Sequence, residues 1–174
     1  EIRNAINDFE KSGKFVVAYN GGEVITQKEY YVSSAANEVY GFPSSTMEFI
    51  GLGAELSFFK GTLDKLEVEV QVIRGSNNDF KSAVEPFFRE NMSDSSRVQI
   101  ERYLTSMWED IRTDISSDRK VKIEELNTIA DSAFIRRADD AVKYKLMDGT
   151  KYRDEIISLM SEKVGLEDGD ELEL

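Results

Sequence analysis

The sequence contains neither cysteine nor histidine. Without cysteine the chain can form no disulfide and offers no thiol nucleophile. Without histidine it can build neither a serine–histidine triad nor a histidine-ligated metal site from its own residues. Any general base among its 174 residues must therefore be a carboxylate, a lysine or a tyrosine. We expect no metal or other cofactor.

Positive charge and long apolar runs are also scarce. The chain has 22 Lys and Arg against 34 Asp and Glu, which gives a net charge of −12. Because phosphate contacts need a basic face, we expect no nucleic-acid partner. No apolar run approaches the roughly 20 residues of a membrane helix. The chain starts within a helical pattern and stops in "EDGDELEL", where a turn leads into an alternating strand, so we expect both ends to be cut from a longer protein.

Short apolar runs alternate with helical patterns along the first half of the chain, and the last third is nearly all helical. This order predicts a single α/β domain over residues 1–174, with a mainly parallel sheet flanked by helices and a helical carboxy-terminal part. The expected strands are 14–19, 38–43 and 68–73. The expected helices are 1–13, 26–36, 53–68, a long helix capped by Ser93, 122–132, 137–146 and 152–165.

Lys81 lies among aromatic and aliphatic residues in "NNDFKSAVEPFFREN", residues 77–91. Its stem could cover apolar surface while the ammonium group reaches water. Alternatively, burial among Phe80, Phe87 and Phe88 would disfavour the charged form of the amine. A neutral amine can activate a serine hydroxyl without histidine, provided that a serine is supplied. Lys81 is thus either a partly covered surface lysine or a general base.

The residue pattern of this segment favours the second interpretation, a general base. "FKSAVEPFFRENMS" resembles the signature around the catalytic lysine of the signal peptide peptidase A family, also called protease IV. The stretches "ITQKEYYVSSAANEVYGFPSS", "GLGAELSFFKGTLDKLEVEVQVIRG" and "RYLTSMWEDIRTDI" are similar to the amino-terminal repeat of its long, two-repeat form. The resemblance runs from about Ala5 to Glu162. It implies a fold related to Clp protease and crotonase, with Lys81 as the catalytic base.

The resemblance also implies that the nucleophile is absent from this chain. In the family, the carboxy-terminal half supplies the serine within a glycine-rich segment. Here Tyr30 and Tyr31 match the aromatic pair that follows the serine, and Gln27 stands in the place of the serine. Ser82 is next to Lys81, but neighbouring side chains point in different directions and do not easily meet. We therefore expect the chain alone to be inactive, with the surroundings of Lys81 open to water.

The implied whole protein is a membrane-associated serine endopeptidase with a Ser–Lys dyad that degrades released signal peptides. The resemblance places it at the cytoplasmic membrane facing the periplasm, while the fragment itself is expected to be soluble. Expected partners are the carboxy-terminal half of the same protein, apolar peptides, and further copies in a tetramer. Two alternatives stay open. One is a catalytically inert domain for assembly and substrate capture. The other is a crotonase-like acyl-CoA enzyme, but the acidic charge and the missing glycine run argue against it.

Overall fold

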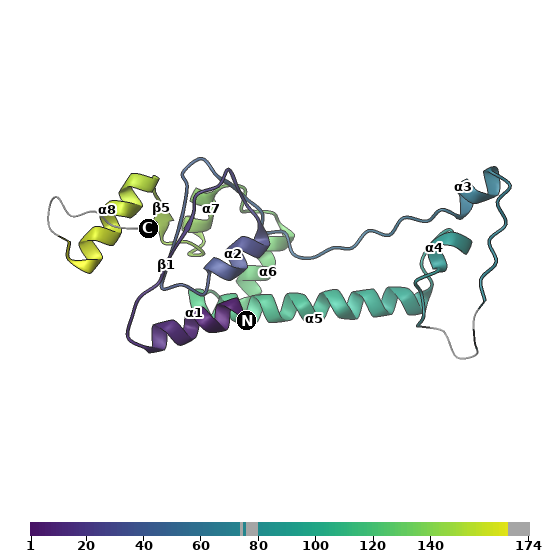
Figure 1. Cartoon of the computed structure of the whole chain (residues 1–174), viewed down its shortest axis with the longest axis horizontal. Helices are drawn as coiled ribbons and strands as arrows, with labels where there is room; N and C mark the ends of the chain where they lie inside the picture. The colour runs from purple at the N-terminus through teal and green to yellow at the C-terminus, as the bar shows by residue number, and fades with distance from the viewer. Residues whose placement is uncertain (74, 76–79, 167–174) are drawn as a thin grey trace. The chain divides into compact units, whose positions relative to one another are not determined.

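The computed structural model describes residues 1–73, 75 and 80–166 (Figure 1). Its contacts divide the chain into two compact units. Unit 1 comprises Glu1–Gly51 and the residues from Ile111 on, and unit 2 comprises Leu52–Asp110. The boundary near residue 110 falls within the long helix α5 (Asp94–Arg119). The strand predicted in "EDGDELEL" lies outside the described residues.

Unit 1 is built on parallel strands, as the sequence predicts. A three-stranded parallel sheet has the order β1–β3–β5, with Val17 opposite Glu38 and Tyr40 opposite Gly149. A second, two-stranded parallel sheet pairs β2 with β4. The strands are β1 (Val17–Asn20), β2 (Val24–Ile25), β3 (Glu38–Gly41), β4 (Thr46–Met47) and β5 (Gly149–Thr150). The fold is therefore α/β with a small, mainly parallel sheet.

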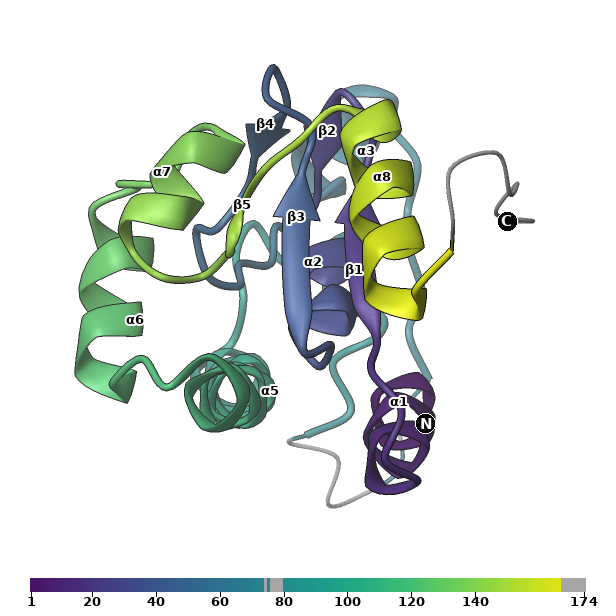
Figure 2. The same cartoon turned by 90° about the vertical axis from the view of Figure 1, so that its left-hand side faces the viewer.

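Helices cover both faces of this sheet. Two of them, α2 and α8, lie on opposite sides of it (Figure 2). The helices of unit 1, besides the end of α5, are α1 (Ile2–Lys11), α2 (Gln27–Ser33), α6 (Ile123–Asp131), α7 (Ala138–Lys143) and α8 (Arg153–Val164). The core between the layers contains Ile25, Tyr30, Val39, Phe49, Ile115, Leu126, Ile129, Ile135 and Leu146. The last three predicted helices are confirmed within a few residues at each end.

Helix α2 is fixed firmly at its start. The Thr26 hydroxyl accepts a hydrogen bond from the Glu29 N–H at 3.2 Å, and the Glu29 carboxylate accepts one from the Thr26 N–H at 2.8 Å. This reciprocal pair is a capping box, which satisfies two N–H groups that the helix cannot pair internally. One turn on, Tyr30 is fully buried and its hydroxyl donates to the Leu146 carbonyl at 2.8 Å. The first turn of α2 is thus a rigid part of unit 1.

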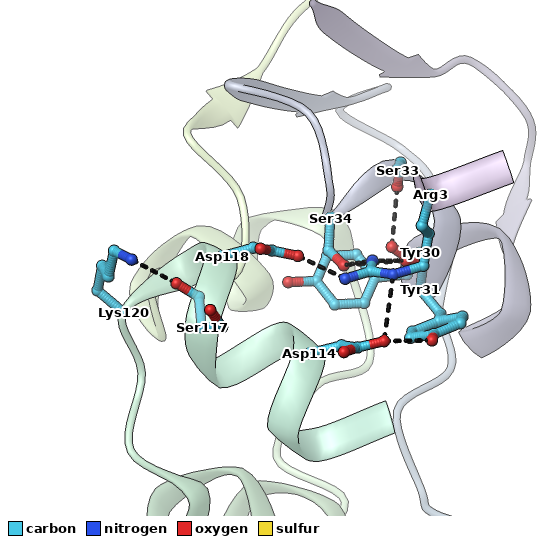
Figure 3. Close-up of polar contacts among 9 residues, drawn as sticks. All are labelled: Arg3, Tyr30, Tyr31, Ser33, Ser34, Asp114, Ser117, Asp118 and Lys120. Atoms are coloured by element: carbon cyan, nitrogen blue, oxygen red, sulfur yellow. Dashed lines mark hydrogen bonds and ion pairs between the residues drawn. The ribbon is translucent and has the colours of Figure 1, made fainter. Parts of the chain in front are cut away.

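Helix α1 buries a charged side chain and leaves two large apolar side chains exposed. Ile2 and Phe9 are 65% and 45% exposed, whereas Arg3 is only 8% exposed. The Arg3 guanidinium forms ion pairs with Asp118 and Asp114 of α5, donates to Ser34 Oγ at 2.9 Å, and stacks over the Tyr31 ring (Figure 3). A charged cluster (Arg3, Tyr31, Ser34, Asp114 and Asp118) therefore ties α1, α2 and α5 together.

The described residues of unit 2 form helices and no strand. Its helices are α3 (Lys60–Lys65), α4 (Glu85–Phe88) and the first part of α5. The predicted helix 53–68 shortens to α3, and the predicted strand 68–73 is wrong, because none of the described residues pairs with this segment. A strand forms only where its N–H and C=O groups find a neighbouring strand. Without one, Val68 and Ile73 stay 49% and 99% exposed.

Candidate functional site

Lys81 stands at the entrance to a short turn in unit 2. The turn at residues 83–84 leads into α4, and the Glu85 N–H donates to the Ser82 carbonyl at 2.9 Å. Pro86 occupies the first turn of α4, where its missing N–H and fixed φ are tolerated. The Lys81 side chain itself is exposed. The local sequence thus builds a turn directly after an exposed lysine.

A buried carboxylate holds this turn in place. Glu85 is 4% exposed and accepts hydrogen bonds from Ser93 Oγ at 2.6 Å and from the Ser93 N–H at 3.1 Å. The same hydroxyl accepts from the Ser96 N–H at 3.2 Å, which confirms Ser93 as the predicted cap of α5. The segment after Lys81 is therefore fixed to the start of α5. Sequence reasoning missed this contact, although a carboxylate within the apolar "KSAVEPFF" was a signal for it.

Replacing Glu85 by alanine should loosen the turn that carries Lys81. The Ser93 N–H and O–H groups lose a charged acceptor, which costs about 1–3 kcal/mol of local stability. We expect faster hydrogen exchange at the Arg89 amide, which donates to the Glu85 carbonyl at 2.9 Å. Glu90→Ala, at an exposed carboxylate of the same unit, is the matched control. Equal protection of Arg89 in both variants would contradict the bracing role of Glu85.

An aromatic contact joins α4 to the residues before α3. The rings of Phe59 and Phe87 stack with centroids 6.2 Å apart, and the Phe59 N–H donates to the Pro86 carbonyl at 2.7 Å. A cavity of about 200 Å³ opens beside them, lined by Lys60, Leu63, Asp64, Val68, Glu69, Val70, Phe87 and Phe88. Phe80 and Phe87 are 62% and 46% exposed. Both rings are therefore partly open to water in this chain.

Gln27, which the resemblance places at the nucleophile position, lies in unit 1. Gln27 is the first residue of α2, and its side chain binds the main chain of Ile50 and Gly51. Nearby serine hydroxyls serve the local structure: Ser33 Oγ donates to the Tyr30 carbonyl at 3.1 Å, and Ser34 Oγ to the Tyr31 carbonyl at 3.0 Å. Gln27 offers no hydroxyl, so this position holds no nucleophile.

The acidic groups and the helices of the described residues bear on metal binding and on membranes. No group of three or more Asp or Glu residues there is arranged to hold a metal ion. Within residues 1–73, 75 and 80–166, no helix combines the length and apolar character that crossing a membrane requires.

Residues 8–167 match Peptidase family S49. The chain belongs to this family. It is 36% identical to Protease 4 of Haemophilus influenzae over 121 residues, which is 70% of this chain and 19% of that protein. It is 34% identical to Protease 4 of Salmonella typhi over 125 residues, 72% of this chain and 20% of that protein. It is 29% identical to the chloroplastic serine protease SPPA of Arabidopsis thaliana over 167 residues, 96% of this chain and 24% of that protein.

Membership of family S49 confirms the resemblance seen in the sequence. These relatives are proteases. The chain spans only about a fifth to a quarter of the length of these relatives. Its assignment to the amino-terminal half of a two-repeat form and the catalytic role of Lys81 stay predictions.

Proposed function

We propose that this chain is the amino-terminal, lysine-supplying part of an S49 serine endopeptidase with a Ser–Lys dyad. One contrast carries the proposal. Lys81 is exposed at the entrance to a turn braced by Glu85, whereas Gln27, at the position aligned with the nucleophile, is a side chain that cannot attack a carbonyl. The chain thus offers a base without a nucleophile, and the serine comes from the carboxy-terminal half of the protein.

In the proposed mechanism, neutral Lys81 Nζ takes the proton of the serine hydroxyl as Oγ attacks the scissile carbonyl carbon. Lys81 then passes this proton to the leaving amine as the C–N bond breaks, which leaves an acyl-enzyme. Water hydrolyses the acyl-enzyme with Lys81 again as the base. Covering the amine with apolar surface of the other half would disfavour its charged form and keep it able to accept a proton.

The proposed substrates are apolar peptides, in the first place signal peptides already released from their precursors. The exposed aromatic residues near Lys81, Phe80 and Phe87, suit an apolar peptide better than a charged one. We further propose that the whole protein works at the cytoplasmic membrane, facing the periplasm, as a homotetramer. These last proposals rest on the family resemblance.

Labelling of the full-length protein with a fluorophosphonate, which reacts with activated serines, tests whether the base and the nucleophile come from different parts of the protein. We expect the label on one serine outside residues 1–174, located by mass spectrometry of the digested protein. The unreacted serines of this chain, Ser33, Ser34 and Ser82 among them, serve as internal controls.

Two results would contradict the proposal. Label on a serine within residues 1–174 would mean that this chain carries its own nucleophile. Equal labelling and peptide hydrolysis by a protein that lacks residues 1–174 would make the chain a catalytically inert domain for assembly and substrate capture.

A further inference from the structure

Both oxygens of the buried Glu85 carboxylate bind one residue, Ser93. The Oε1 atom accepts a hydrogen bond from the Ser93 hydroxyl at 2.6 Å, and Oε2 accepts one from the Ser93 N–H at 3.1 Å. Two hydrogen bonds to the two oxygens fix the orientation of the carboxylate as well as its distance from the partner. Ser93 is itself held at the start of α5, where its hydroxyl accepts from the Ser96 N–H at 3.2 Å. The side chain of Glu85 is therefore tied to a capped helix end.

The main chain of Glu85 binds the residue that follows Lys81. The Glu85 N–H donates to the Ser82 carbonyl at 2.9 Å and closes the turn at residues 83–84. Ser82 is joined to Lys81 by a peptide bond, which is planar and stiff. A continuous path of hydrogen bonds and covalent bonds therefore runs from Ser93 through Glu85 and Ser82 to Lys81. All four residues belong to unit 2.

A buried carboxylate is a costly way to hold a turn together. Glu85 is only 4% exposed, and its neighbours along the chain, Val84 and Pro86, are apolar. An apolar side chain at this position would avoid the loss of hydration that a buried charge suffers. Apolar burial is non-directional, however, whereas the two hydrogen bonds of the carboxylate fix an orientation. A reacting group needs such precision, because a misplacement of about 1 Å can cost 100-fold in rate.

We propose that Glu85 is a positioning residue for the reaction: through Ser82 it fixes the main chain beside Lys81, and with it the place from which the amine reaches the serine hydroxyl. The inference rests on the proposed function. Glu85 does not need to touch the reacting atoms, because it acts through the turn and hence through Lys81. Its effect on the rate therefore depends on the presence of the lysine, which a purely structural role of Glu85 does not require.

The test uses the full-length protein and compares Glu85 variants in two backgrounds, the wild type and Lys81→Ala. Glu85→Gln keeps the size of the side chain but offers one acceptor oxygen in place of two, and Glu85→Ala removes both. Hydrolysis in the Lys81→Ala background is measured without and with an added primary amine, which supplies a base that the turn does not hold. Glu90→Gln, at an exposed carboxylate of the same unit, is the matched control. The constants kcat and KM are measured for each variant.

In the wild-type background we expect kcat to fall about 10-fold in Glu85→Gln and about 100-fold in Glu85→Ala, with a nearly unchanged KM. In the Lys81→Ala background, neither replacement should lower the residual rate or the amine-rescued rate by more than about twofold. The reason is that a residue that acts through the lysine has no further effect once the lysine is gone. Glu90→Gln should match the wild type.

Two results would overturn the proposal. An equal fall in both backgrounds, with the amine-rescued rate included, would mean that Glu85 supports the fold of unit 2 and not the base. Wild-type kcat in Glu85→Gln would overturn it as well, and this milder variant decides the question if Glu85→Ala does not fold. Failure of the proposed function is a different result, because Lys81→Ala would then keep wild-type activity.

Discussion

In the full-length protein, Lys81→Ala is expected to lower kcat for an apolar peptide by about 100- to 10,000-fold, the usual contribution of a general acid–base residue. KM and the melting temperature should change little, because the Lys81 side chain is exposed in this chain and Glu85 holds the turn after it. Lys81→Arg should be equally inactive, since guanidinium stays protonated and cannot accept the serine proton.

Two further measurements separate a catalytic lysine from a structural one. Lys65→Ala removes another exposed lysine of unit 2 and should leave hydrolysis unchanged. Small primary amines added to Lys81→Ala should restore part of the activity, because they supply the missing base. If Lys81→Ala hydrolysed peptides at the wild-type rate, Lys81 would be a surface lysine whose stem covers apolar side chains, and not the base.

Helices with their own end signals were predictable from the sequence. The Thr26 and Ser93 caps start α2 and α5 where expected, because each capping hydroxyl lies only three residues from the N–H group that donates to it. The strand predicted at 68–73 is wrong for the opposite reason. Its alternating β-branched pattern predicts a surface suited to a strand, but the neighbouring strand has to come from elsewhere. Pattern alone cannot tell whether that partner is present in the chain.

The candidate site, too, could be predicted only in part from the sequence. Composition around Lys81 left two interpretations open, and the resemblance to a peptidase family favoured the catalytic one. The partners in the contacts that hold the site were not predictable, because each contact joins residues with no shared local pattern. Gln27 lies more than twenty positions before Ile50 and Gly51, and Glu85 binds Ser93 across the end of α4. Side-chain to main-chain bonds of this kind depend on the path of the whole loop.

The charged cluster around Arg3 offers the largest expected effect on stability. Arg3→Ala should lower the free energy of unfolding by about 2–4 kcal/mol, because it removes the buried cation that pairs with Asp114 and Asp118 and leaves Ser34 without its donor. The value falls short of that for a fully buried pair, since the Asp114 and Asp118 side chains are 45% and 24% exposed and water can reach them.

Urea unfolding followed by circular dichroism measures the effect of Arg3→Ala against two comparisons. Lys11→Ala breaks a pair on the same helix in which Lys11 and Asp8 are 76% and 72% exposed, so it should cost less than about 0.5 kcal/mol. Arg3→Lys keeps the charge but loses the planar fork that reaches Asp118, Asp114 and Ser34 together, and should fall between the two. Should Arg3→Ala cost no more than Lys11→Ala, the ion pairs of Arg3 would not stabilise the packing of the three helices, and the burial of a charge at the third residue of the chain would have no stabilising role.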